Sequence, residues 1–305
     1  SLQSVTFCSG VKTIGRAAFR ENTALINISW GDTIQTVDMQ AFASSNTSKK
    51  MILEKVILPD SVTTIGLAAF QLCDKMNYLK LPNNENFTTI TQNAFGYCSS
   101  LKYLKLPDNI LEVVSGGFGY CTSLENISFS ANLKTLNYLS FNGCSSLKSV
   151  VLPPKLVNFN VGAFARCSNL TKVAIDANSQ NFIDDNGCIV EKSTNKLVYA
   201  NKNVKNIPSY IKIIGDRSFD TRTDLTQIII SDTVEQIGHD VFWACTGLTS
   251  VTIGSAVTSI GPDAFGNVSA SCTFVFKDTT GTWSSYTSTH NNSNDTYTKA
   301  DTATR

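Results

Sequence analysis

A phenylalanine that returns at a nearly constant interval is the feature that most constrains how this chain can fold. Six of the nine intervals between successive members are 23 residues, and the other three are 28, 25 and 55 residues. A fixed period of this length is typical of a solenoid, in which each repeat forms one turn and stacks on the next. The repeated residues are Phe19, Phe42, Phe70, Phe95, Phe118, Phe141, Phe164, Phe219, Phe242 and Phe265.

Other apolar residues follow the same period. In the repeat of Phe95 they are Ile90, Leu101, Leu104 and Leu106. The alternating stretch that ends at Leu106 predicts a short strand, and the proline that follows it in several repeats ends the strand. The segment around the phenylalanine is short enough to form one helical or 3-10 turn.

The repeats predict one domain, although a length of 305 residues by itself suggests about two. A single 23-residue coil carries apolar residues on every side and cannot bury them alone. Stacked coils bury them as continuous columns. We therefore expect an α/β repeat solenoid of about ten coils, rich in strands and with short helical or 3-10 turns.

Two segments carry a resemblance to a known family. Residues 62–73 read VTTIGLAAFQLC, and residues 237–245 read IGHDVFWAC. This pattern resembles the BspA-like leucine-rich repeats of bacterial and protozoan surface proteins, and the resemblance covers residues 1 to about 276. It implies a right-handed leucine-rich-repeat horseshoe, exposure at the cell surface or secretion, and binding of host or matrix proteins. The family has no catalytic motif to transfer.

The long interval and the C-terminal region depart from the repeat. Two strand-like segments, 187–191 and 196–200, flank residues 192–195 and predict a hairpin in an insertion at about 176–206. We favour a structural elaboration of one coil over a binding device. The expected domain is a solenoid over 1–276, followed over 277–305 by a cap containing Trp283 and Tyr286 and a polar Ser/Thr/Asn-rich tail. The sequence begins inside a repeat, so we expect any signal peptide to have been removed or to lie outside it.

Six of the nine cysteines stand three residues after the phenylalanine of their repeats. Stacking would place them at successive levels inside the solenoid, where a reduced thiol packs as a small apolar group. A linear column cannot converge tetrahedrally on zinc, so we expect no metal site. The members of this cysteine ladder are Cys73, Cys98, Cys121, Cys144, Cys167 and Cys245.

Composition and histidine content argue against several functional classes. The net charge of +1 disfavours a nucleic-acid partner. The sequence contains no run of 18 apolar residues, so it predicts no membrane span. A serine or cysteine nucleophile normally needs a histidine base. His239 occupies a variable column and His290 lies in the polar tail, so we expect no catalytic residue, no cofactor and no enzymatic activity.

The outward residues of the predicted strands form the candidate ligand surface. Extended repeat surfaces are where solenoids bind, tyrosine is a common interface anchor, and lysine steers an acidic partner. Exposed lysines can also simply keep a sheet soluble and unpaired, and this simpler interpretation stays open. We call the candidate set the lysine–tyrosine face: Lys55, Tyr78, Lys80, Lys102, Tyr103, Lys105, Lys148 and Lys172.

Three functional classes follow from these observations. The leading one is a non-enzymatic adhesion or protein-recognition module, at the cell surface or secreted, that binds a protein such as a host or extracellular-matrix protein through the strand face as a monomer. The second is a passive spacer or display scaffold for another domain. The third, carbohydrate binding or catalysis, has the least support, because only Tyr78 and Tyr103 lie adjacent as an aromatic platform.

Overall fold

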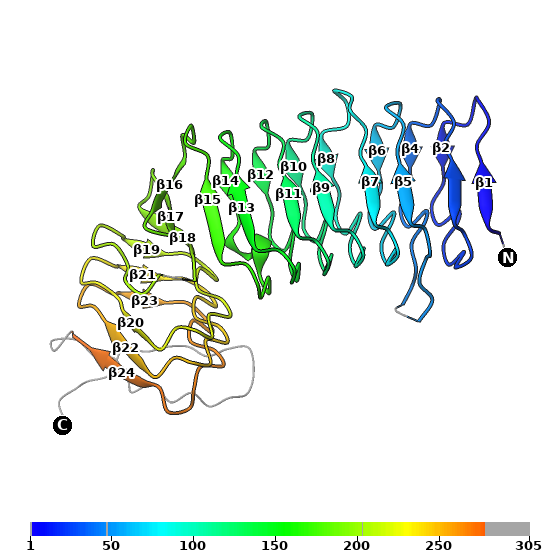
Figure 1. The fold of residues 1–305 in the computed structure, drawn as a ribbon. Coiled ribbons are helices and arrows are strands. Elements are labelled where there is room, and N and C mark those ends of the chain that lie inside the picture. Colours follow the sequence, from blue (N-terminus) through cyan, green and yellow to red (C-terminus); the bar gives the residue numbers. More distant parts are fainter. Residues whose placement is uncertain (1, 47, 203, 278–305) are drawn as a thin grey trace. The chain divides into compact units, whose positions relative to one another are not determined.

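Stacked short strands make up nearly all of the regular structure. The computed structural model describes residues 2–46, 48–202 and 204–277. Within them the chain forms a β-solenoid of about 12 turns with almost no helix (Figure 1). The expected cap residues Trp283 and Tyr286, the polar tail and His290 lie outside the described residues.

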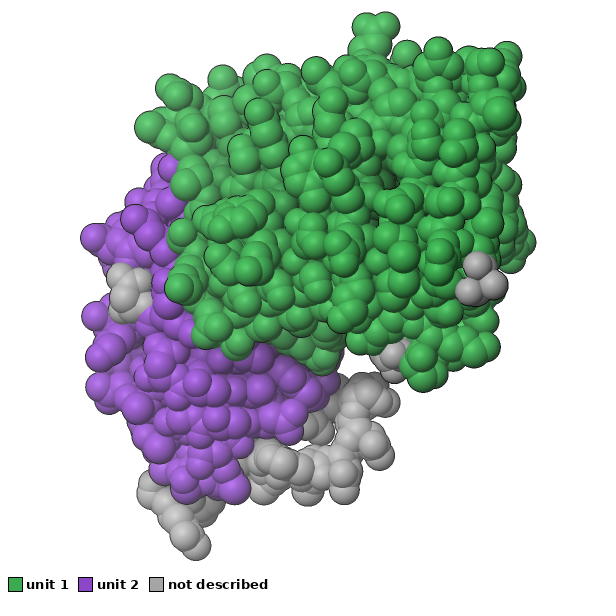
Figure 2. Space-filling view, turned by 45° about the vertical axis from the view of Figure 1, so that its right-hand side comes forward, with its two compact units in different colours: residues 1–170, 176–180 green, residues 171–175, 181–305 purple. Residues whose placement is uncertain are grey.

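The chain divides into two compact units, which Figure 2 colours separately. The first unit comprises residues 1–170 and 176–180. The second comprises residues 171–175 and 181–305.

In the first unit each turn contributes two strands, and strands of a kind lie side by side (Figure 1). Parallel ladders join β1 to β3, β5 to β7 and β9 to β11. The first set is β1 (Ser4–Thr6), β3 (Asn27–Ser29), β5 (Lys55–Ile57), β7 (Tyr78–Lys80), β9 (Tyr103–Lys105), β11 (Asn126–Ser128) and β13 (Ser149–Leu152). The second set is β2 (Thr13–Ile14), β4 (Thr36–Val37), β6 (Thr64–Ile65), β8 (Thr89–Ile90), β10 (Glu112–Val113), β12 (Thr135–Leu136) and β14 (Asn158–Phe159).

The second unit builds the antiparallel segment of the long interval into one of its sheets. Three strands, β16 (Phe182–Asp185), β17 (Cys188–Glu191) and β18 (Lys196–Ala200), form an antiparallel meander. The last of them pairs in parallel with β19, so that one sheet runs β16-β17-β18-β19-β21-β23. The remaining strands are β15 (Lys172–Ile175), β19 (Ile213–Ile214), β20 (Gln227–Ile229), β21 (Gln236–Ile237), β22 (Ser250–Ile253), β23 (Ser259–Ile260) and β24 (Thr273–Phe276).

The expected helical turns, and with them the α/β class, are corrected by the structure. Among the described residues one 3-10 helix occurs, η1 (Val161–Phe164). In most other repeats the residues two before and two after the phenylalanine have positive φ, as at Ala68 (55°) and Leu72 (64°). A helix needs negative φ throughout, so these segments cannot be helical. Their alternate amides bond to the next turn instead: the N–H of Phe70 donates to the carbonyl of Ala94 at 2.8 Å.

The expected number of coils is corrected as well, because two turns lack the repeated phenylalanine. The turn that begins with β15 carries β16, β17 and β18 where other turns carry the phenylalanine segment. The last described turn begins with β24 and also lacks this phenylalanine. Counting phenylalanines therefore gives ten where the solenoid has about 12 turns.

The core consists of columns that run from turn to turn. Phe70 stacks on Phe95 at 5.4 Å between ring centroids, and Phe95 stacks on Phe118 at 5.3 Å, with the ring planes within 8°. All six members of the cysteine ladder are buried, and each thiol donates to the carbonyl of a phenylalanine one turn earlier, over 3.1–3.5 Å. Burial raises the pKa of the Cys121 and Cys245 thiols to about 12.

Candidate ligand-binding face

Strand alternation positions the lysine–tyrosine face. In β7 and β9 the central leucines, Leu79 and Leu104, are buried in the core, and the residues on either side point outward. Successive side chains of a strand alternate between its two faces, so the buried leucine fixes the direction of its neighbours. Tyr78 is 49% exposed and Tyr103 is 62% exposed.

All eight residues of the face are exposed, but the structure does not bring all of them together. Seven belong to the first unit, while Lys172 belongs to the second. Four of them line one hollow of about 810 Å³ over β7, β9 and β11. These four are Tyr78, Lys80, Tyr103 and Lys105.

Lys55 supports this hollow from the adjacent strand. Its Nζ lies 5.3 Å from the centre of the Tyr78 ring, which is within the range of a cation–π contact. The two residues also occupy the same register position in the ladder between β5 and β7. Lys102 and Lys148 do not line the hollow.

Sequence reasoning left out further polar residues that line the hollow. Asn77, Asn83, Asn126 and Ser128 contribute hydrogen-bonding groups, and Asp108 adds a carboxylate. Asn126 and Ser128 share the outward positions of Tyr103 and Lys105 one turn later, so alternation predicts their direction, but the candidate set was limited to lysines and tyrosines. Asn83 and Asp108 lie in loops after the strands, where the repeat pattern carries less information.

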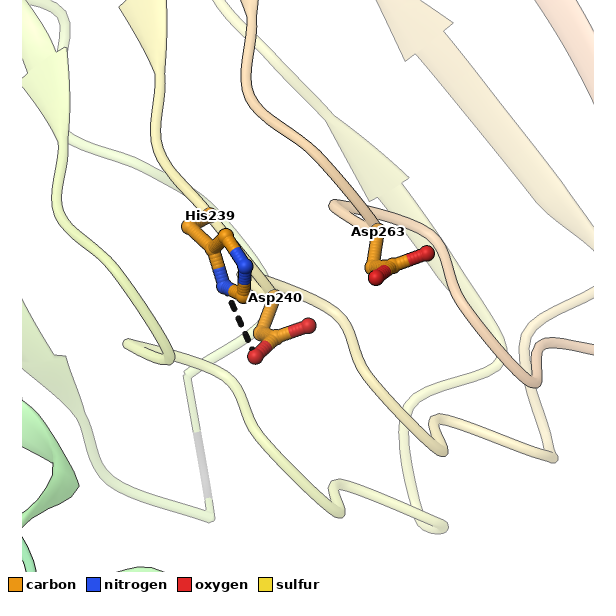
Figure 3. A group of neighbouring side chains, drawn as sticks. All are labelled: His239, Asp240 and Asp263. Carbon is orange, nitrogen blue, oxygen red and sulfur yellow. Dashed lines mark ion pairs between the residues drawn. The ribbon is translucent and has the colours of Figure 1, made fainter. Parts of the chain in front are cut away.

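A second group of polar side chains lies in the second unit. Figure 3 shows His239, Asp240 and Asp263, whose potential ligand atoms all lie within 4.8 Å of one another. The Nδ1 atom of His239 is 2.7 Å from a carboxylate oxygen of Asp240, which also pairs with Arg217. Burial raises the pKa of the Asp240 carboxyl, while Arg217 and His239 oppose this shift.

This group has the residue types that bind a metal, yet a structural role accounts for its geometry. The guanidinium of Arg217 already supplies the positive charge that the buried Asp240 carboxylate needs. Asp240 and Asp263 have φ of 52° and 51°, and aspartate is among the residues that tolerate this region best. The two aspartates are 23 residues apart, so they occupy equivalent positions of successive repeats. This spacing is the sequence feature that could have predicted that they lie together.

A smaller hollow, of about 280 Å³, lies over β19, β21 and β23 in the second unit. Gly215, Gly238 and Gly261 line it at equivalent positions of successive turns. A Cβ on Gly261 would lie 2.6 Å from the backbone of Gly238, so close stacking of the turns requires glycine here. The hollow is therefore explained by packing.

Comparison with known families agrees with this architecture. The sequence model described as the BspA type leucine rich repeat region matches in six copies, over residues 1–86, 63–187 and 192–299. The chain belongs to this leucine-rich repeat family. Membership in the BspA-type family confirms the resemblance predicted from residues 62–73 and 237–245.

Solved structures of three bacterial proteins share the fold. A leucine rich cell surface protein from Faecalibacterium prausnitzii has a TM-score of 0.60 and 19% identity, covering 90% of this chain and 79% of that one. A leucine-rich repeat protein from Bacteroides ovatus has a TM-score of 0.53 and 22% identity, covering 90% and 84%. A leucine-rich repeat protein from Eubacterium ventriosum has a TM-score of 0.59 and 18% identity, covering 79% and 78%.

One further comparison and one structural criterion gave negative results. No curated protein matches the sequence. Within the part of the chain that the structure describes, none of the helical segments has the length and hydropathy to cross a bilayer.

Proposed function

We propose that this BspA-type repeat protein is a non-enzymatic recognition or adhesion module that binds another protein through the lysine–tyrosine face of its first unit. The observation that carries the proposal is the hollow of about 810 Å³ lined by Tyr78, Lys80, Tyr103 and Lys105. Family membership supports a surface or protein-binding role.

The physical case rests on how the side chains are held. Tyr78 and Tyr103 are on short strands whose central leucines are buried, so binding costs little backbone entropy. Tyrosine contributes large contact area with few rotatable bonds and is enriched among residues that dominate binding energy. Lysines beside such anchors accelerate association with an acidic partner.

We further propose an extracellular location, secreted or at the cell surface. The support is the family and the Faecalibacterium prausnitzii relative, which is described as a cell surface protein. The class of partner that fits this location is a host or extracellular-matrix protein.

The test measures binding of the full chain to a panel of purified extracellular-matrix proteins by biolayer interferometry. We expect the quadruple variant Tyr78→Ser, Lys80→Gln, Tyr103→Ser, Lys105→Gln to lose at least about tenfold in affinity, because two anchors and their charges disappear together. The control replaces two exposed lysines elsewhere in the first unit, Lys12→Gln and Lys134→Gln, and should bind as the wild type does. Unchanged binding by the quadruple variant would refute this face, whereas binding of the wild type to none of the panel would favour a passive spacer.

A further inference from the structure

The hollow lies where the backbone ladder between successive turns is interrupted. Ladders join β5 to β7 and β9 to β11, but among the described residues no backbone hydrogen bond joins β7 to β9. Both strands nevertheless line the same hollow. The same interruption occurs between β3 and β5 and between β11 and β13, so the side chains that line the hollow are what distinguish this place.

The two strands carry like charges at equivalent positions of the repeat. Lys80 ends β7 and Lys105 ends β9, and like charges on neighbouring strands repel. Neither lysine forms an ion pair within the described part of the chain. The acid that lines the hollow, Asp108, accepts the N–H of Ala131 at 3.1 Å instead. The two ammonium groups thus have no carboxylate of the described residues within ion-pair distance.

We propose that a carboxylate of an acidic polypeptide segment binds between Lys80 and Lys105, with Tyr78 and Tyr103 contacting the residues on either side of it. This inference rests on the proposed function and specifies its partner. A carboxylate in this position accepts from both ammonium groups and removes their repulsion, and such charge-assisted hydrogen bonds are short and strong.

The surroundings of the two lysines favour a polypeptide over a sulfated glycan. Asn77 and Asn126 add amide groups to the hollow, and these groups pair with peptide N–H and C=O groups. A glycan with a sulfate on every sugar needs a dense array of cations. Here two lysines line the hollow, and Lys55 is directed onto the Tyr78 ring.

The experiment pans a random dodecapeptide phage library on the full chain and measures affinities of the selected synthetic peptides by fluorescence anisotropy. We expect the selected peptides to be enriched in aspartate or glutamate, and to bind less tightly as salt rises. Replacing the acid of a peptide by its amide should cost about tenfold in affinity for the wild-type protein, a readout independent of any folding defect in a variant. Lys80→Gln with Lys105→Gln should cause a similar loss, and Lys12→Gln with Lys134→Gln should cause none.

Three results would overturn the proposal in distinguishable ways. Selected peptides without acids, whose binding is lost in Tyr78→Ser with Tyr103→Ser, would refute the carboxylate site and leave the proposed function standing. Binding of heparin but of no peptide, abolished by Lys80→Gln with Lys105→Gln, would replace the polypeptide by a sulfated glycan. Recovery of neither ligand would overturn the inference and the lysine–tyrosine face together.

Discussion

At the scale of single residues, Arg222 is an exception to the repeat that makes contacts a cysteine could not make. It stands where other repeats have a ladder cysteine, and its side chain is 5% exposed. Its Nε lies 2.8 Å from a carboxylate oxygen of Asp224. Its guanidinium also donates to the carbonyls of Ala200, Asn201, Lys202 and Val204. These carbonyls lie at and just after the end of β18, so one side chain ties the inserted meander to the regular turns.

Replacing this arginine by the residue of the repeat should therefore destabilise the protein. We expect Arg222→Cys to lower the free energy of unfolding by about 3 kcal/mol, because buried carbonyls lose a charged donor that cysteine cannot replace. Urea unfolding followed by circular dichroism measures this change. Arg20→Cys is the matched control, since Arg20 is exposed. A variant at position 222 as stable as the control would show that water satisfies these carbonyls equally well.

At the scale of elements, the segment around each phenylalanine is where sequence reasoning was least successful. The length and spacing of this segment were predicted correctly. The predicted helical turn was wrong, because the segment forms hydrogen bonds to the next turn through alternate residues such as Ala68, Phe70 and Leu72. The positive φ at Ala68 and Leu72 is not encoded by glycine, the usual signal for this conformation. Stacking between turns overrides the local preference, and a single repeat cannot reveal this.

The same element yields a prediction at Gly143, where a neighbouring ring leaves little room for a side chain. Gly143 lies two residues after Phe141 with φ of 72°, and a Cβ there would lie 2.8 Å from the Tyr120 ring. That ring stacks on Tyr97 at 4.7 Å between centroids, so it cannot shift without breaking this contact. We expect Gly143→Ala to lower the free energy of unfolding by about 1–2 kcal/mol, from both backbone strain and the displaced ring.

Gly96→Ala is the control for this prediction. Gly96 lacks a positive φ, and the nearest heavy atom to its Cβ would lie 3.4 Å away, an ordinary contact. The urea unfolding midpoint of the Gly96→Ala variant should stay close to that of the wild type. Equal effects of the two substitutions would mean that neither φ nor the Tyr120 ring limits side chains at Gly143.

At the scale of the whole molecule, the repeat predicts well which side chains stack in columns. It predicts poorly where the hydrogen-bonded pairing of strands is interrupted. Periodicity alone located the buried cysteine ladder and the outward lysines and tyrosines, because every turn reuses the same inward and outward positions. It did not reveal the missing ladder between β7 and β9. The ladder is also interrupted between β3 and β5 and between β11 and β13, and the last of these places has the ordinary 23-residue interval, so the spacing of the repeat does not mark an interruption. The hollow is therefore a property of the stack rather than of any repeat.

The cysteine ladder also determines how stability depends on pH. Burial raises the pKa of five of its thiols, to about 12 at Cys121 and Cys245. The other three are Cys73, Cys98 and Cys144. In the unfolded chain a thiol loses its proton near pH 8.5, whereas the folded chain retains it. Stability from these groups is therefore complete below about pH 8.5 and is lost as pH rises towards the folded pKa.

We therefore expect a steep alkaline loss of stability in the reduced protein, to which each buried thiol adds about 1.4 kcal/mol per pH unit above pH 8.5. Urea unfolding from neutral pH to about pH 10.5, with reductant present, measures the slope. Cys98→Ala with Cys121→Ala removes two thiols and should reduce the slope by about 2.8 kcal/mol per pH unit. Both proteins carry the same tyrosines and lysines, so the difference between their slopes reports the two cysteines alone. Equal slopes would mean that the thiols ionise in the folded solenoid, which requires water to reach the column beside the phenylalanines.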